Sequence, residues 1–144
     1  MDLSLDSYIK EQFCIGQVDI KTYSPLTLAY IGDCIFDLIV RTVVVGKGNT
    51  RPNELHGRTS KVVKAASQAR MLELIDPYLS VQEKDIARRG RNAKSFTKAK
   101  NATTSDYRKA TGMEALVGYL YLDNQFERAV ELVKLGCELT EAKL

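Results

Sequence analysis

The chain has 144 residues, 44% hydrophobic and 27% charged, a composition typical of one globular domain that can bury its own core. No apolar run approaches the roughly 20 residues that a membrane span needs, and the acidic N-terminus lacks the apolar core of a signal peptide. Three cysteines without metal-ligand spacing indicate reduced thiols. We therefore expect a cytoplasmic protein without membrane contact, with a single domain over 1–144 that comprises an N-terminal extension (1–23) and a core (24–140).

The net charge of +3 is unevenly distributed along the chain. Nine basic and two acidic residues lie between Lys84 and Lys109, so this segment carries +7 and the remainder −4. A concentrated basic segment on a mildly acidic body is typical of a protein that binds a polyanion.

Hydrophobic residues recur with a helical period, which predicts an all-α fold of about six helices. The first is expected over about 4–13, followed by a loop over 16–23. Ser24, as the N-cap, and Pro25, at the first helical position, begin a central helix that ends at residues 46–48. Further helices are expected over about 50–75, 82–90, 103–122 and 124–140. A flexible basic loop is expected over about 90–105.

Two carboxylates stand in strongly apolar surroundings. Asp33 follows Gly32 inside the central helix, whose residues are apolar on nearly every face, and Glu114 lies in a similar context near the other end of the chain. Burying an ionised carboxylate costs several kcal/mol unless it is paired. Two that face each other need a cation, so the pattern predicts a site for Mg²⁺, which prefers carboxylate and water oxygens. The alternative is an internal salt bridge from each acid to an arginine or lysine.

Glycines accompany both acids. Gly32 adjoins Asp33, while Gly112 and Gly118 lie two residues before and four after Glu114. Glycine costs roughly 1 kcal/mol against alanine inside a helix, so these positions need a structural reason. We expect them to let two core helices approach closely beside their carboxylates.

Three further polar residues are weaker candidates for an outer shell around the metal. Asp37 follows Asp33 by one helical turn, although a solvated or arginine-paired aspartate would have the same spacing. Glu54 lies in the first turn of a helix, where an acid is favoured by the helix dipole anyway. His56, the only histidine, has no partner motif, and a packing or polar surface role is the alternative.

The basic segment offers groups that can hydrogen-bond phosphates, which gives affinity without sequence reading. A merely solubilising face is the alternative. Phe96 is its only aromatic residue, so binding of a duplex by shape fits better than stacking of single-stranded bases. The candidate RNA-binding residues of this segment are Arg88, Arg89, Arg91, Asn92, Lys94, Ser95, Lys98 and Lys100.

Four blocks in chain order resemble the Mini-III branch of the ribonuclease III family. They are Leu26–Asp33 with Cys34–Phe36, then Pro52–His56, then Arg89–Ser95, and finally Tyr107–Arg108 with Thr111–Leu116. An Ile-Gly-Asp step alone would be weak, but four matching blocks are highly specific. The similarity extends over about residues 24–133.

This resemblance implies an all-helical endonuclease domain that dimerises and cuts double-stranded RNA with Mg²⁺, leaving 5′-phosphate and 3′-hydroxyl ends. It assigns Asp33 and Glu114 as metal-binding catalytic acids and adds Tyr107 and Arg108 to the RNA-binding residues. The Mini-III branch lacks the double-stranded RNA-binding domain of its larger relatives. Its members trim the precursor of large-subunit (23S) ribosomal RNA, so we expect that substrate, with a ribosomal protein or pre-ribosomal particle as a candidate partner.

The chain departs from the larger ribonucleases III at three positions. They carry acids where this chain has Leu26, Ala29 and Thr111, so we expect one well-held metal ion completed by water. A non-catalytic RNA-binding module, such as a ribosome-assembly factor, is a second hypothesis and predicts RNA binding without cleavage. A helical protein-interaction domain is a third and predicts no RNA affinity at moderate salt.

Overall fold

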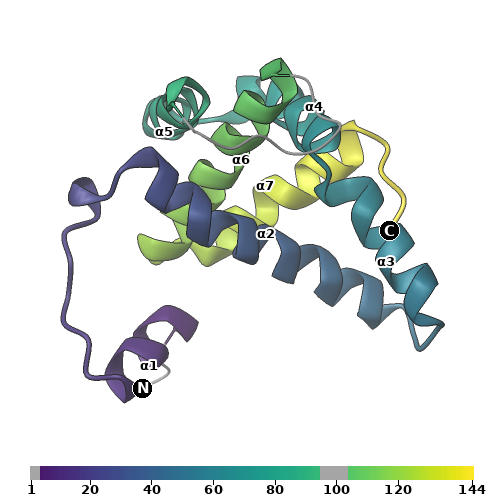
Figure 1. Ribbon diagram of the computed structural model, residues 1–144, viewed down its shortest axis with the longest axis horizontal. Coiled ribbons are helices and arrows are strands. Elements are labelled where there is room, and N and C mark those ends of the chain that lie inside the picture. Colours follow the sequence, from purple (N-terminus) through teal and green to yellow (C-terminus); the bar gives the residue numbers. More distant parts are fainter. Residues whose placement is uncertain (1–3, 95–103) are drawn as a thin grey trace.

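The computed structural model describes residues 4–94 and 104–144, and every regular element within them is helical (Figure 1). The all-α prediction is therefore confirmed. The α-helices of the described residues are α1 (Leu5–Gln12), α2 (Pro25–Gly46), α3 (Pro52–Val63), α4 (Ala65–Ile75), α5 (Val81–Asn92), α6 (Thr104–Leu122) and α7 (Phe126–Leu139). Two 3₁₀ turns, Ile20–Thr22 and Asp76–Tyr78, precede α2 and α5. No described helix is both long and apolar enough to cross a membrane.

The start of α2 follows the predicted capping pattern. The Ser24 hydroxyl accepts a hydrogen bond from the Thr27 amide at 3.2 Å, and Pro25 occupies the first helical position. The start of α5 has a complete capping box, in which Ser80 and Glu83 each accept from the other's backbone amide, at 3.1 and 2.8 Å. Both helix starts are thus determined locally.

The helix predicted over 50–75 is wrong, because two helices occupy this range. Lys64 adopts an extended conformation (ψ 154°) between α3 and α4. The carbonyls that the break leaves free accept hydrogen bonds from side chains of α4: Ser67 Oγ donates to Lys61 O at 2.5 Å, and Gln68 Nε2 to Val63 O at 2.9 Å. This capping uses neither glycine nor proline, so the sequence carried none of the usual signals of a helix end.

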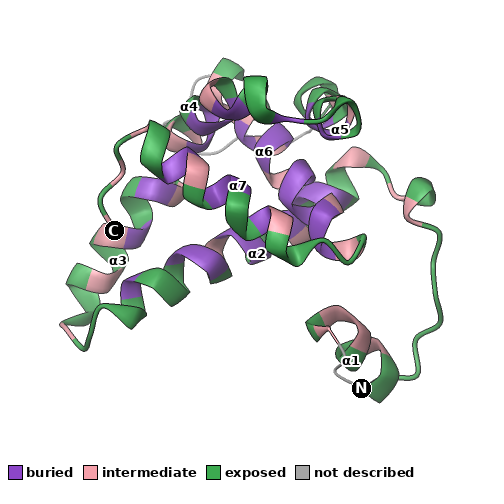
Figure 2. Ribbon diagram, turned by 180° about the vertical axis from the view of Figure 1, so that it is seen from behind, coloured by how far each residue is buried: buried purple, intermediate pink, exposed green. Residues whose placement is uncertain are grey.

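Helix α6 lies at the centre of the molecule and packs against α2, α4, α5 and α7 (Figures 1 and 2). Its contact with α2 is unusually close. A Cβ on Gly32 would lie 1.7 Å from the Glu114 backbone oxygen, and one on Gly118 would lie 1.9 Å from the Leu28 oxygen. The expected close approach beside the acids is confirmed for these two glycines. Gly112 instead faces the Ala87 carbonyl, so it accommodates α5.

A helix that is apolar on nearly every face is expected to be buried on every side, and for α2 this expectation is wrong. One face packs on α6, whereas the opposite face is exposed along its length (Figure 2). The exposed apolar stripe of α2 consists of Leu26, Tyr30, Cys34, Leu38 and Val45, at intervals of four or seven residues. Asp33 is exposed too and lies beside this stripe. Helix α2 thus has one apolar face in the core and a second apolar stripe that no described element covers.

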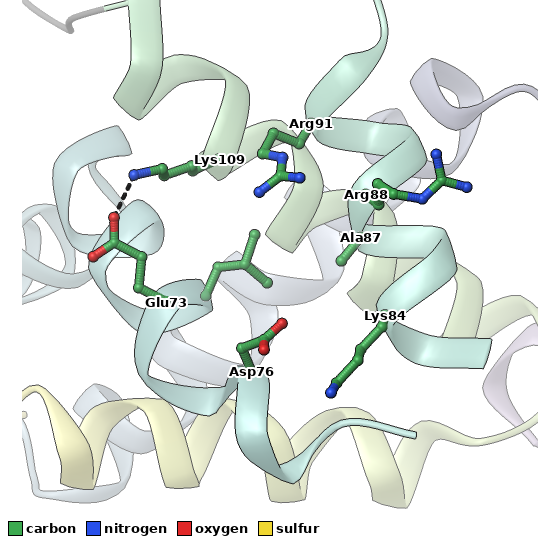
Figure 3. Close-up of a pocket in the computed structure, with 8 residues that line it drawn as sticks. Glu73, Asp76, Lys84, Ala87, Arg88, Arg91 and Lys109 are labelled. Carbon is green, nitrogen blue, oxygen red and sulfur yellow. Dashed lines mark hydrogen bonds and ion pairs between the residues drawn. The ribbon is translucent and has the colours of Figure 1, made fainter. Parts of the chain in front are cut away.

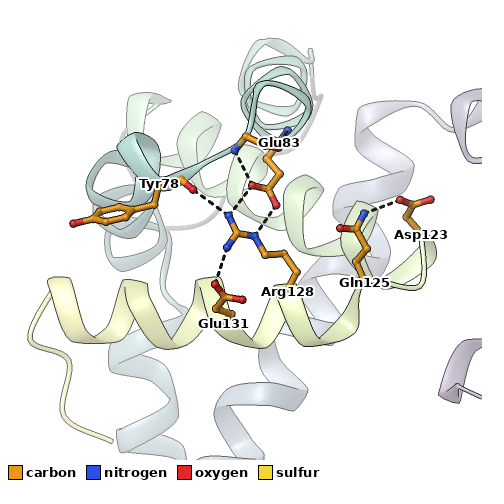
Figure 4. A network of polar contacts seen from close by, with 7 residues as sticks. Tyr78, Glu83, Asp123, Gln125, Arg128 and Glu131 are labelled. Atoms are coloured by element: carbon orange, nitrogen blue, oxygen red, sulfur yellow. Dashed lines mark hydrogen bonds and ion pairs between the residues drawn. The ribbon is translucent and has the colours of Figure 1, made fainter.

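A buried ion pair joins α5 to α7 (Figure 4). Glu83 is only 5% exposed, and both of its carboxylate oxygens accept from the Arg128 guanidinium at 2.9 Å. Arg128 also donates to the Tyr78 carbonyl at 3.0 Å and to Glu131 at 2.8 Å. The hydrogen bond from Arg128 is the main reason that the pKa of Glu83 is lowered, despite its burial.

We predict that Arg128→Met lowers the free energy of unfolding by about 3 kcal/mol at pH 7, because Glu83 is left buried without its cation. The lowered pKa of Glu83 stabilises the fold above the ordinary carboxyl value, and this contribution is lost as pH falls through the folded value. The difference between the two proteins should therefore shrink at pH 3. Urea denaturation at both pH values measures it.

The matched control is Glu131→Gln, which removes a partner of Arg128 whose side chain is 67% exposed. An exposed ion pair contributes at most about 1 kcal/mol. If Arg128→Met were no more costly than this control, the pair with Glu83 would not stabilise the fold.

Candidate active site

The acid pair, Asp33 and Glu114, lies where α2 crosses α6. Gly32, the residue before Asp33, touches the backbone of Glu114 directly, which brings the two carboxylates to the same crossing. Glu114 is half-buried, whereas Asp33 is exposed. The prediction that both acids are buried is therefore wrong for Asp33, because the outer side of α2 is uncovered in the single chain.

The electrostatics of the pair match two acids that lie close together. Burial, and secondarily the negative charge of Asp33, raises the pKa of Glu114 to about 8. The pKa of Asp33 is raised by partial burial and by the charge of Asp37. No lysine or arginine within residues 4–94 and 104–144 forms an ion pair with either acid. The alternative of two internal salt bridges is thus wrong for the described residues.

The donor set fits one divalent cation that prefers oxygen. The described part of the chain holds no group of three or more acidic, histidine or cysteine side chains suited to a metal, so the protein would offer two carboxylates and water would fill the other positions. Beside Glu114, the buried Oε1 atom of Gln68 has no hydrogen-bond partner. A water molecule of a hydrated cation would supply the hydrogen-bond donor that this oxygen lacks.

The three departures from the larger ribonucleases III do not add ligands. Ala29 is buried and apolar, and Leu26 belongs to the exposed apolar stripe of α2. The Thr111 hydroxyl donates to the Tyr107 carbonyl of its own helix at 2.9 Å. The expectation of a single ion rests on these substitutions and stays a prediction.

Of the three outer-shell candidates, one lies near the acid pair and two lie on α3. Asp37 is close enough to affect Asp33 and pairs with Arg41, Nε to Oδ2, at 2.7 Å. Glu54 begins α3, where it contacts Thr50 and Arg58, and His56 is exposed on the same helix. Helix α3 packs against α2 and α4, and nothing couples Glu54 or His56 to the acid pair within the described residues.

The candidate RNA-binding residues meet where α5 ends and α6 begins. Gly90 faces α6, so Arg88, Arg89 and Arg91 lie on the exposed side of α5. A cleft of about 500 Å³ lies between the two helices. The residues that line it are Arg91, Asn92, Thr104, Ser105, Arg108 and Lys109.

Lys94 is exposed just after α5, and Tyr107 is half-buried in the first turns of α6. The predicted residues Ser95, Lys98 and Lys100, together with most of the predicted loop, lie outside the described residues.

A second cleft, of about 330 Å³, opens on the neighbouring side of α5 against α4 (Figure 3). Lys84, Arg88 and Arg91 line it from α5, while Glu73 and Asp76 line it from the α4 side. Lys109 reaches from α6 to pair with Glu73, and Arg88 pairs with Asp85 at 2.6 Å. Arg91 borders both clefts, so the positive surface continues around the end of α5.

Gln68 is the residue of this site that the sequence reasoning missed. It is 2% exposed, and its amide lies close enough to Glu114 to lower the pKa of that carboxyl group. The available signal was an amide on the apolar face of a helix, at the spacing of Met71, Leu72 and Ile75. That signal says that the amide needs a partner but does not say which one.

The fold and the acid pair define a helical protein with a candidate cation site at a helix crossing, and comparison with known proteins extends this description. The Ribonuclease III domain model matches residues 26–125. A Mini-ribonuclease 3 from Clostridium tetani is 44% identical over 93% of this chain and 88% of its own length. One from Thermoanaerobacter sp. is 42% identical over 98% of this chain and 99% of its own.

A crystal structure of a Fusobacterium nucleatum protein superimposes with a TM-score of 0.74 and 29% identity. The match covers 86% of this chain and 99% of that one. The chain therefore belongs to the ribonuclease III family, in its Mini-ribonuclease 3 branch. It is an endoribonuclease, and the two non-catalytic hypotheses are set aside.

Proposed function

We propose that this endoribonuclease hydrolyses double-stranded RNA with Mg²⁺ held by Asp33 and Glu114, and that it matures the precursor of large-subunit (23S) ribosomal RNA. The observation that carries the proposal is a pair of neighbouring carboxylates without a cationic partner among the described residues. Membership of the Mini-ribonuclease 3 branch supports the RNA substrate.

Asp33 and Glu114 would supply the protein oxygens to the ion, and water would complete its coordination. The bound ion would lower the pKa of a coordinated water and stabilise negative charge on the scissile phosphate. Hydrolysis of the bond to the 3′ oxygen then leaves 5′-phosphate and 3′-hydroxyl ends. Because Glu114 holds a proton below a pKa of about 8, the ion must displace that proton, and its affinity should rise with pH.

A gel tests the reaction directly. Long duplex RNA and a precursor transcript with paired 23S ends are incubated with the protein and either Mg²⁺ or a chelator. We expect cleavage of both substrates with Mg²⁺ and intact RNA with the chelator. Cleavage that persists in the chelator would remove the metal from the proposal. An untouched precursor would remove the ribosomal substrate but not the nuclease.

We further propose that the protein acts as a homodimer through the exposed apolar stripe of α2. Tyr30 is 82% and Val45 63% exposed, and an exposed apolar stripe on one helix favours burial against another chain. A two-fold dimer would present one acid pair to each strand of a duplex, whose backbones have their own two-fold relation. Sedimentation equilibrium of the wild type and of Tyr30→Glu tests this; a monomeric wild type would contradict it.

The basic residues at the end of α5 are proposed to bind phosphates flanking the cut. We predict that neutralising Arg91, Lys94 and Lys98 together weakens binding of duplex RNA. The slope of the logarithm of the binding constant against the logarithm of the salt concentration should become shallower by about one for each lost phosphate contact. Binding is measured in Ca²⁺ or chelator across a salt series, so that cleavage does not interfere.

The matched control neutralises Lys47, Lys61 and Lys134, which are exposed elsewhere and form no ion pair with another described residue. This control changes the net charge equally. Equal losses in the two triple variants would mean that only net charge matters.

A pre-ribosomal particle or ribosomal protein remains a proposed partner, in the cytoplasm.

A further inference from the structure

Gln68 contains an unsatisfied buried polar atom. The residue is 2% exposed, and its Oε1 is the buried side-chain oxygen or nitrogen that lacks a hydrogen-bond partner within the described residues. Leaving a buried acceptor unpaired destabilises the folded state. An apolar residue of similar length, such as methionine, would avoid that cost, so the amide needs a reason.

The orientation of this amide is fixed by the break between α3 and α4. Its Nε2 donates to the carbonyl of Val63, the last residue of α3, at 2.9 Å. Rotating the amide by half a turn would place Oε1 against that carbonyl, and two acceptors would then face each other. Oε1 therefore remains without a partner in either the break or the helix.

The same amide reaches the acid pair. The Gln68 side chain lies close enough to Glu114 to lower the pKa of its carboxyl group, the effect of an amide N–H directed at a carboxylate. Gln68 thus approaches the carboxylate from α4, and Asp33 approaches it from α2. Glu114 therefore has neighbours on α2 and α4 as well as on its own helix, α6. Because Oε1 and Nε2 belong to one amide group, the unpaired Oε1 also lies near Glu114.

We propose that Gln68 is a positioning residue of the cation site, an inference that rests on the proposed function. Its N–H orients the Glu114 carboxylate, and its Oε1 accepts a hydrogen bond from a water molecule that the bound cation retains. Mg²⁺ dehydrates reluctantly and keeps several waters, which need acceptors in their outer shell. The bound water would satisfy the orphaned oxygen, so both ends of the amide gain a role.

The test uses Gln68→Met, which keeps the length of the side chain and removes both its donor and its acceptor. Mn²⁺ binding to the full chain without RNA is followed through the spin resonance of the free ion. We expect the dissociation constant to rise about 10- to 100-fold, the usual effect of losing an outer-shell partner. The Mg²⁺ concentration for half-maximal cleavage should rise similarly, and cleavage should largely recover at saturating Mg²⁺.

Thr59→Val is the matched control. Thr59 is 6% exposed, and its hydroxyl donates to the Leu55 carbonyl of α3 at 2.9 Å, away from the acids. It loses a buried hydrogen bond in the same region but should bind Mn²⁺ as the wild type does. A folded Gln68→Met protein with wild-type Mn²⁺ affinity would overturn the positioning role and leave the proposed function standing.

A second variant keeps the inference testable if Gln68→Met does not fold. Gln68→Glu keeps the size of the side chain but adds a negative charge, so the metal-free protein should be less stable while Mn²⁺ raises its melting temperature more than that of the wild type. An equal Mn²⁺-induced rise in both proteins would count against Gln68. A wild type that neither binds Mn²⁺ nor loses cleavage in chelator would instead defeat the proposed metal site itself.

Discussion

Glu114→Gln should reduce cleavage of duplex RNA by at least about 100-fold while the folded protein still binds the RNA. Loss of an outer-shell partner already costs up to about 100-fold, and Glu114 is proposed to contact the ion directly. Asp33→Asn should have the same effect, because a neutral amide oxygen contributes far less than a carboxylate to Mg²⁺ binding. Single-turnover cleavage with excess Mg²⁺ measures the loss.

The matched control for these variants is Glu127→Gln, an exposed acid in the first turn of α7. It removes one negative charge without touching the α2–α6 crossing and should cleave at the wild-type rate. Wild-type cleavage by either Glu114→Gln or Asp33→Asn would exclude that residue from the mechanism.

Glu114→Gln should also raise the stability of the metal-free protein, although it reduces cleavage. Because the pKa of Glu114 is about 8 in the fold against 4.5 for the free side chain, the folded chain holds a proton that the unfolded chain releases between these values. The free energy of unfolding should therefore fall as pH rises through this window, in total by on the order of 2–4 kcal/mol without metal.

Glu114→Gln cannot ionise, so it should remove this slope and be more stable than the wild type above pH 8. Denaturation in chelator at pH 5 and pH 9 measures both proteins. Parallel slopes would mean that Glu114 is not the titrating group. A site that is costly to the fold and required for cleavage is the usual stability–activity trade-off.

Local chemistry explains which parts of the fold were predictable. Ser24 and Pro25 mark the start of α2 through one hydrogen bond and one fixed dihedral, both readable from neighbouring residues. The α3–α4 break was not readable, because it depends on the side chains of Ser67 and Gln68 reaching back across the turn. Their hydrogen bonds span six and five residues and match no common end signal.

The exposure of Asp33 illustrates a second limit. An apolar helix face predicts burial but does not state whether the same chain or another one covers it. The sequence of α2 is apolar on both sides, so the core face and the exposed stripe with Tyr30 and Leu38 look alike. The sequence singled out Asp33 and Glu114, because a buried carboxylate needs a partner, but it left open whether that partner is a shared cation or a separate arginine or lysine for each.

Long-range partners were the least predictable. Glu83 and Arg128 are 45 residues apart, and neither has a local feature that names the other. Gln68 and Glu114 are similarly distant. Such pairs are fixed by the packing of α4, α5 and α7 around α6, which periodicity alone does not specify.

Gly32→Ala should lower the free energy of unfolding by more than about 3 kcal/mol. Its Cβ would lie 1.7 Å from the Glu114 backbone oxygen and 2.8 Å from the Gly118 nitrogen. Since the obstacles are backbone atoms, no side-chain rotation relieves the overlap, and α2 must move away from α6. Urea denaturation monitored by circular dichroism measures the loss.

Gly57→Ala is the matched control, because Gly57 lies inside α3 and a Cβ there would have nothing within 4 Å. Alanine is favoured over glycine in a helix by about 0.5–1 kcal/mol, so this variant should be slightly more stable than the wild type. The same substitution thus has opposite signs at two helical positions. A Gly32→Ala protein as stable as the wild type would mean that the two backbones do not touch.

The contact at Gly32 also sets the distance between the two acids. The loss of stability and the loss of cleavage in Gly32→Ala should therefore be separable. Where the variant remains folded, at low temperature and without denaturant, α2 is displaced from α6 and the carboxylates of Asp33 and Glu114 are further apart. A displacement of about 1 Å can cost 100-fold in rate. Cleavage should therefore be lost in the folded population, whereas a purely structural role would reduce activity only in proportion to the unfolded fraction.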